Sequence, residues 1–131
     1  MRKRDHAHFI VWMALGAALG AMLREWIVMI LDVPHPWILI AAINMIGAFI
    51  ISVIYEIEHL LHRHVKVFGA IGFCGGFTTF SHFSNHTAKM ITEGNGVVAL
   101  CNIVLSLVGT FAAVYLGIAI VKLGAKIWRV R

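Results

Sequence analysis

The strongest constraint on this chain is its arrangement into four long apolar runs within only 131 residues. Hydrophobic residues make up 60% of the sequence, charged residues 13%, and the mean hydropathy is +0.87. A soluble domain of this size cannot bury so much apolar surface, so lipid must act as part of the solvent. We therefore expect an all-α integral membrane protein in which residues 1–131 form a single domain. The predicted transmembrane helices cover residues 9–31, 37–55, 65–90 and 97–123.

The third apolar run contains a segment at its centre that a regular membrane-spanning helix tolerates poorly. Gly75 and Gly76 raise the cost of helix there, and Thr78 and Thr79 bond readily to nearby backbone groups. Non-helical backbone at membrane depth persists only where protein buries it or where it lines a wet cavity. A packing kink is the simpler alternative. The clustering of Gly-Gly, Thr-Thr and phenylalanines favours a functional break near residues 75–79.

Polar side chains occur in the second and fourth runs at a depth where lipid offers no partner. Asn44 lies near the centre of the second run, and an unpaired amide in hydrocarbon costs about 2–7 kcal/mol. It therefore either bonds to a neighbouring helix or contacts a backbone group or a permeant ion. Asn102, Ser106 and Thr110 are four residues apart, so they form one polar stripe along a helix. Three polar groups aligned on one face at membrane depth indicate that this face of the helix lines a path.

The groups at membrane depth are suited to a small anion. They are Asn44, the segment Thr78–Ser81, Phe83 and the stripe of the fourth run, without a ring of carboxylates. Amides and hydroxyls can donate to an anion, and the edge of a phenylalanine ring carries partial positive charge. Backbone carbonyls freed by a helix break suit a small hard cation. The residues therefore predict selective permeation of a small anion, whose identity they leave open.

Charged and titratable residues near the ends of the runs admit more than one explanation. Arg24 and Glu25 fall in the last third of the first run, where they either snorkel to the interface or make a buried polar contact. His59, His62 and His64 do not have the spacing of a compact metal site on one helical face. A solvated interfacial segment is the favoured interpretation of these histidines.

The basic residues predict a fixed orientation in the membrane. Four spans place both termini and the central connection on one side, together with nine of the eleven Lys and Arg residues. Such a bias puts that side in the cytoplasm. The nine residues are Arg2, Lys3, Arg4, Arg63, Lys66, Lys122, Lys126, Arg129 and Arg131. Their position beside apolar spans explains the net charge of +5 without nucleic acid as a partner.

The third run resembles the Fluc family of fluoride channels, also called CrcB. The most specific likeness is the segment Gly72-Phe73-Cys74-Gly75-Gly76-Phe77-Thr78-Thr79-Phe80-Ser81. Supporting likeness is found from Gly16 to Arg24 and in Ala42-Ile43-Asn44-Met45-Ile46-Gly47. The resemblance covers the chain from Ala14 to Gly117, and the fourth-run stripe agrees with it.

This resemblance implies a passive, fluoride-selective channel and no enzyme activity. It implies an antiparallel dimer with two separate fluoride pathways, in the inner membrane of a bacterium. Such channels let fluoride leave a cell after it has entered as neutral hydrofluoric acid. A homodimer is favoured, but an antiparallel homodimer needs both orientations from one sequence. The strong basic bias therefore leaves a heterodimer with an oppositely oriented paralogue as the alternative.

The resemblance also implies roles for individual residues. A structural sodium ion would lie at the centre of the dimer, held by the backbone carbonyls of Gly75 and Thr78. Arg24 matches an arginine that follows the glycine pattern of the first helix. The predicted fluoride pathway comprises Asn44, Thr79, Phe80, Ser81, Phe83, Asn102, Ser106 and Thr110.

Four positions depart from the family pattern. Glu25 stands where an aromatic residue is common, and Asn102 where some members have a tyrosine. His82 replaces a small hydroxyl residue, and His86 replaces an acidic residue. The two histidines would make conduction pH-sensitive if either titrates near neutrality.

Three other function classes are weighed against the channel. A small multidrug or cation exporter needs an intramembrane carboxylate that exchanges protons for substrate, and Glu25 is its candidate. A membrane enzyme needs a nucleophile and a base at matched spacing, which the sequence does not offer. A non-transporting assembly subunit could associate through the small-residue face at Gly16 and Gly20, but it would leave the fourth-run stripe unexplained.

Overall fold

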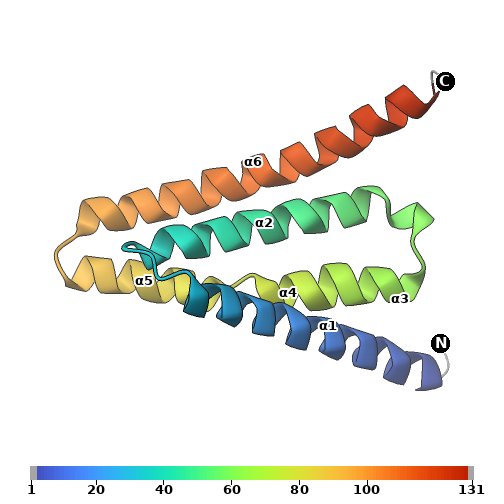
Figure 1. Ribbon diagram of the computed structural model, residues 1–131, viewed down its shortest axis with the longest axis horizontal. Coiled ribbons are helices and arrows are strands. Elements are labelled where there is room, and N and C mark those ends of the chain that lie inside the picture. The colour runs from blue at the N-terminus through green and yellow to red at the C-terminus, as the bar shows by residue number, and fades with distance from the viewer. Residues whose placement is uncertain (1–2, 130–131) are drawn as a thin grey trace.

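The computed structural model describes residues 3–129, and every regular element within that range is helical. Three helices are long: α1 (Lys3–Ile30), α2 (Pro36–Glu56) and α6 (Gly96–Arg129). The chain between α2 and α6 is divided into η1 (Glu58–Leu60), α3 (Arg63–Lys66), η2 (Val67–Phe73), α4 (Cys74–Phe77) and α5 (Phe80–Thr92). The row from α3 to α5 lies between α1 and α2, and α6 packs on α2 (Figure 1).

The long helices are those that can cross a membrane. By length and composition, His6–Ile30, Pro36–Glu56 and Gly96–Ile127 are each long and apolar enough. The first, second and fourth predicted spans fall on these three helices. Over the third predicted span, the described chain has a row of shorter helices in place of one continuous helix.

Both ends of the described chain and the connection from α2 to α3 lie at the same end of the bundle (Figure 1). The basic residues expected there include Lys122, which pairs with Glu56 at 3.7 Å, and Lys66, which pairs with Glu58. Arg2 and Arg131, which belong to the predicted basic side, lie outside the described residues. The sequence therefore predicted correctly that the central connection lies at the same end of the bundle as both ends of the described chain.

Glycines let the backbone of α1 pack directly against the backbone of η2 and α4. A Cβ added at Gly16 would lie 2.2 Å from the carbonyl oxygen of Phe68, and one at Gly20 would lie 2.2 Å from that of Phe73. From the other side, a Cβ at Gly76 would lie 2.2 Å from backbone oxygen of α1. The small-residue face predicted on the first run is therefore used within the chain, where it fixes the position of η2 and α4.

The centre of the bundle is apolar and lies around the break. Ile40, Ile43 and Phe77 are fully buried, and Phe73 and Phe83 pack against them. Just before the break, η2 is a π-helix in which the backbone N–H of Cys74 bonds to the carbonyl of Gly69, five residues back. Such segments often lie at functional sites.

The histidine segment after α2 lies at the end of the bundle that also holds the chain termini (Figure 1). Side chains of His59, His62 and His64 are exposed, and the ring of His64 lies 6.1 Å from that of Trp12. Among the described residues, no three His, Cys, Asp or Glu side chains are placed to hold a metal ion together.

Candidate functional site

The helix is interrupted at Thr78 and Thr79, whose backbones are extended (φ −76°, ψ 156° and φ −148°, ψ 116°). Thr78 ends α4. Its N–H makes the last helical bond, to the carbonyl of Cys74 at 3.0 Å, and its hydroxyl donates to the same carbonyl at 2.8 Å, while its ψ of 156° turns the chain out of the helix. Thr79 begins α5, because its hydroxyl accepts from the backbone N–H of His82 at 3.3 Å. Threonine suits both positions, since its hydroxyl bonds to backbone that leaves the helical pattern.

Asn44 on α2 replaces the helical partners that Thr79 has lost. Its Oδ1 accepts from the N–H of Thr79 at 2.8 Å, and its Nδ2 donates to the carbonyl of Thr79 at 3.2 Å. In an uninterrupted helix the N–H of Thr79 would bond to the carbonyl of Gly75. That carbonyl therefore loses its regular donor. Gly75 also faces open space, because nothing lies within 4 Å of a Cβ built on it.

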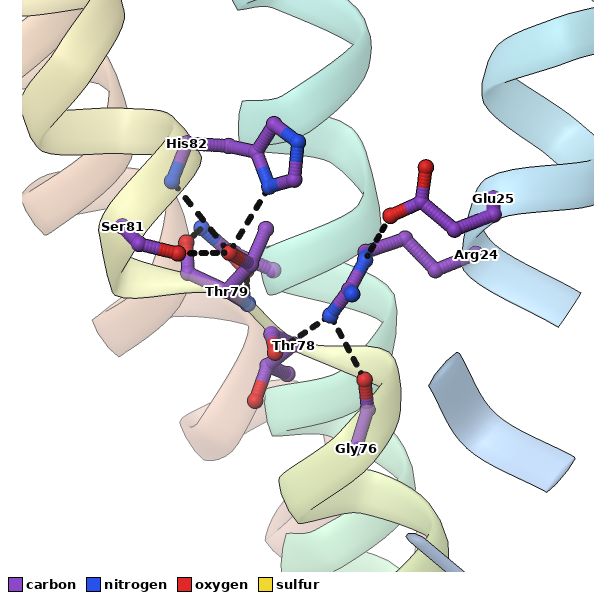
Figure 2. A network of polar contacts seen from close by, with 8 residues as sticks. Arg24, Glu25, Gly76, Thr78, Thr79, Ser81 and His82 are labelled. Carbon is purple, nitrogen blue, oxygen red and sulfur yellow. Dashed lines mark hydrogen bonds and ion pairs between the residues drawn. The ribbon is translucent and has the colours of Figure 1, made fainter. Parts of the chain in front are cut away.

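Arg24 on α1 binds the end of α4 (Figure 2). Its Nη1 donates to the carbonyl of Gly76 at 2.7 Å and to that of Thr78 at 3.3 Å. Its Nε donates to Glu25 at 3.1 Å. The Arg24 side chain is 16% exposed and that of Glu25 is 50% exposed. Of the two explanations for this pair, the buried polar contact therefore describes Arg24, which places a positive charge where the helix end is negative.

A cavity of about 690 Å³ lies against the break, between α2, η2, α4, α5 and α6. None of the described residues that line it carries a charge. Apart from Ser81 and Asn102, it contains all the residues predicted for the anion pathway and the sodium site. These are Asn44, Gly75, Thr78, Thr79, Phe80, Phe83, Ser106 and Thr110. Eight of the seventeen residues that line this cavity were thus named from the sequence, and their roles stay predictions.

Phe80 and Phe83 form an aromatic pair on the wall of the cavity. Their ring centroids are 5.6 Å apart and the ring planes meet at 44°. Phe83 is half-buried against the core, whereas Phe80 is 78% exposed. The two rings project from one face of α5, directly after the cap formed by Thr79.

Asn102 does not line the cavity but lies behind its wall. It is 1% exposed, and its Nδ2 donates to the hydroxyl of Thr87 at 2.9 Å. The Thr87 hydroxyl donates to the carbonyl of Phe83 at 2.8 Å, and Ser106 donates to Oδ1 of Asn102 at 3.4 Å. This chain of bonds attaches α5 to α6 directly behind the aromatic pair.

A family model described as "CrcB-like protein, Camphor Resistance (CrcB)" matches residues 11–118. The chain belongs to the CrcB family. A relative from Leptospira interrogans named "Fluoride-specific ion channel FluC" is 36% identical over 120 residues, which cover 86% of this chain and 94% of the relative. Relatives of the same name from Gloeothece citriformis (32% identical, 88% and 98% covered) and a Shewanella species (33%, 82% and 91%) are also similar.

The part of the chain matched to the CrcB family includes every residue of the site described above. Besides Asn102, two more of the residues predicted from the sequence lie outside the cavity lining. Ser81 is exposed and contacts the hydroxyl of Thr79 at 3.1 Å, and Arg24 lies on the α1 side of the break (Figure 2). Glu25, the carboxylate considered for an exporter, is likewise absent from the lining.

Several residues in and around the cavity were not predicted from the sequence. Tyr55 and Phe111 line the cavity, and Thr87 supports its wall. Tyr55 could have been found from Asn44, because it lies eleven residues further along α2 and thus on the same face. Thr87 offered no such signal, since its importance depends on which residue of α6 it meets.

Proposed function

We propose that this chain is a fluoride-specific ion channel through which fluoride leaves the cell passively. The observation that carries the proposal is the uncharged cavity, which is lined by Asn44 and Thr79 together with the paired rings of Phe80 and Phe83. Membership of the CrcB family and the names of its relatives agree with this function.

The lining accounts for selectivity for a small anion by weak contacts. The hydroxyl of Thr110 can donate to an anion, and ring edges of Phe80 and Phe83 can face it. A path without fixed charge binds the ion weakly enough to release it, so several such contacts in series replace its water. The exporter alternative is disfavoured, because Glu25 is paired with Arg24 and lies outside the cavity.

The row from α3 to α5 serves in this proposal as the fourth membrane-spanning layer, broken at Thr78 and Thr79. Its interrupted backbone is compatible with lipid surroundings, because Asn44 and Arg24 satisfy groups that the break exposes. The basic end of the bundle would then lie in the cytoplasm, with the chain in a bacterial inner membrane.

An antiparallel dimer with two pathways would close the cavity. The rings of Phe80 and Phe111 on its wall are 78% and 65% exposed, and Tyr55 and Ile71 are also exposed. A second copy would cover these groups and complete the path. We favour a homodimer over a heterodimer with an oppositely oriented paralogue.

The carbonyls of Gly75 and Thr78 fit the structural sodium ion proposed for the dimer centre. That of Gly75 has lost its helical donor to the Asn44 pairing, and Gly75 lines the cavity. That of Thr78 accepts a long bond from Arg24, at 3.3 Å, and has a second lone pair to offer. Neutral carbonyl oxygens are suitable ligands for a small hard cation. When bound, the ion would supply a fixed positive charge that holds two breaks together.

Growth of fluoride-sensitive bacteria tests the proposed export. Cells that lack their own fluoride exporter and express this chain should grow at fluoride concentrations that stop cells with an empty vector. Cells expressing Phe80→Ile to the same membrane level should stay sensitive. Equal sensitivity with the unmodified chain, present and folded in the membrane, would contradict the proposal.

A further inference from the structure

We propose that His82 and His86 form a binding site for a divalent transition metal of the zinc class, separate from the cavity described above. Both histidines line a second, smaller cavity of about 110 Å³, together with Asp32. This cavity lies where α5 meets the connection between α1 and α2. The connection is at the end of the bundle opposite the chain termini (Figure 1).

The spacing of the two histidines matches a known way of binding such metals. They are four residues apart on α5, so their Cβ atoms are about 5–6 Å apart on one helical face. Two histidines at this spacing on a helix can share one zinc ion, with metal–nitrogen distances of about 2.0–2.1 Å. The site therefore needs no rearrangement of the backbone.

Water would complete the coordination of the metal. Among the described residues, no third His, Cys, Asp or Glu is placed to join the two histidines as a direct ligand. The cavity has room for an ion and roughly two or three waters, since one water occupies about 30 Å³ in the liquid. Asp32 is exposed on the rim and supplies a negative charge. Two protein ligands and water predict moderate affinity.

The hydrogen bonds of His82 prepare its ring for a metal. Its Nδ1 lies 3.1 Å from the hydroxyl of Thr79, so Nε2 is the nitrogen left for the metal (Figure 2). A metal on Nε2 requires the proton on Nδ1, which then donates to Thr79, while the Thr79 hydroxyl donates to Ser81 at 3.1 Å. A partner on the second ring nitrogen that fixes the tautomer is usual for metal-binding histidines.

The same hydroxyl connects this metal site to the larger cavity. Thr79 lines that cavity, and its backbone is the partner of Asn44. A bound metal would fix the Thr79 hydroxyl toward Ser81 and hold the start of α5 still. We therefore expect occupancy to slow fluoride movement; this part of the inference rests on the proposed function.

Calorimetric titration of the full-length protein with Zn²⁺, with any histidine tag removed, tests the site itself. We expect one Zn²⁺ per subunit and an affinity that falls about tenfold or more in His82→Gln and in His86→Gln. His59→Gln, an exposed histidine outside this cavity, is the matched control and should retain the affinity of the unmodified protein. Should His82→Gln fail to fold, His86→Gln decides alone. Affinity unchanged in His86→Gln, or no stoichiometric binding, would overturn the site.

Fluoride release from liposomes tests the connection to the path. Zn²⁺ should slow release through the unmodified protein and leave release through His86→Gln unchanged. Binding without any effect on release would overturn the connection and leave the site standing. If the metal-free protein releases no fluoride, the proposed function fails, whereas the calorimetric result still decides the metal site.

Discussion

Asn44 and Thr79 bond to each other twice, because the side-chain amide of Asn44 pairs with both the N–H and the carbonyl of Thr79, at 2.8 and 3.2 Å. The amide thus bonds to the extended residue Thr79 in the way that a neighbouring β-strand would. It keeps the break open with both backbone groups of Thr79 paired, and it leaves the carbonyl of Gly75 without its regular helical donor. The proposed anion path and the proposed cation site both depend on this pairing.

Asn44→Asp should therefore damage the channel. A carboxylate can accept from the N–H of Thr79 but cannot donate to its carbonyl, and it puts negative charge beside the anion path. Leaving that carbonyl unpaired costs about 1–3 kcal/mol. We expect a lower thermal unfolding midpoint in detergent and loss of fluoride release from liposomes. Asn95→Asp, in the exposed loop before α6, is the control and should behave as the unmodified protein. Normal release through Asn44→Asp would contradict the role of the pairing.

Phe80→Ile should slow fluoride release with little effect on folding. The ring is largely exposed in the subunit, so its loss removes little buried surface, but it removes a ring edge from the cavity wall. We expect release to fall about tenfold or more, equivalent to about 1.4 kcal/mol in the barrier. Phe9→Ile, on α1 where the ring lies under Arg63, should leave release unchanged. Unchanged release through Phe80→Ile would show that ring edges do not face the ion.

Gly20→Ala should destabilise the fold. Its new Cβ would lie 2.2 Å from the carbonyl oxygen of Phe73, and backbone must shift to relieve that contact. Overpacking of this kind costs about 1–3 kcal/mol. We expect a lower unfolding midpoint and less folded protein in the membrane. At Gly124 the same change meets nothing within 4 Å, so Gly124→Ala should retain both. Equal behaviour of the two variants would mean that α1 does not approach η2 so closely.

Thr87 and Asn102 should act as one unit. Thr87→Val leaves the amide of Asn102 without its buried acceptor, whereas Thr87→Ser keeps the hydroxyl. In a double-mutant cycle with Asn102→Leu, we expect a coupling of about 0.5–1.5 kcal/mol in stability. Thr87→Val should also slow fluoride release, because the Phe83 carbonyl loses the hydrogen bond from Thr87 that connects it to Asn102 on α6. Additive effects, or no rescue by serine, would argue against this support.

Residue patterns predicted much of the fold. Gly16 and Gly20 indicated a close helix contact. In the third run, the Gly-Gly pair and the Thr-Thr pair that follows it indicated where regular helix would end. Both features are local, since the cost of a backbone conformation depends mainly on the residues that adopt it. The π-helix η2 was not predicted, because bonding over five residues has no residue pattern of its own.

Contacts between distant segments were harder to predict. The sequence indicated that Asn44 needs a partner but not that the partner is the backbone of Thr79. For Asn102, helical periodicity placed it correctly on one stripe with Ser106 and Thr110. Periodicity does not tell what covers that stripe at each level, and α5 covers Asn102. Asn102 is therefore a buried support in this structure, where the sequence predicted a lining residue.

Fluoride release from liposomes tests the central claim most directly. Purified protein in liposomes loaded with potassium fluoride should release fluoride to an electrode once valinomycin lets potassium leave, because the ion then moves down its gradient without charge build-up. With potassium chloride inside, the same liposomes should release no chloride above the protein-free background. Absence of fluoride release from folded, incorporated protein, or chloride release at a similar rate, would contradict a fluoride-specific channel.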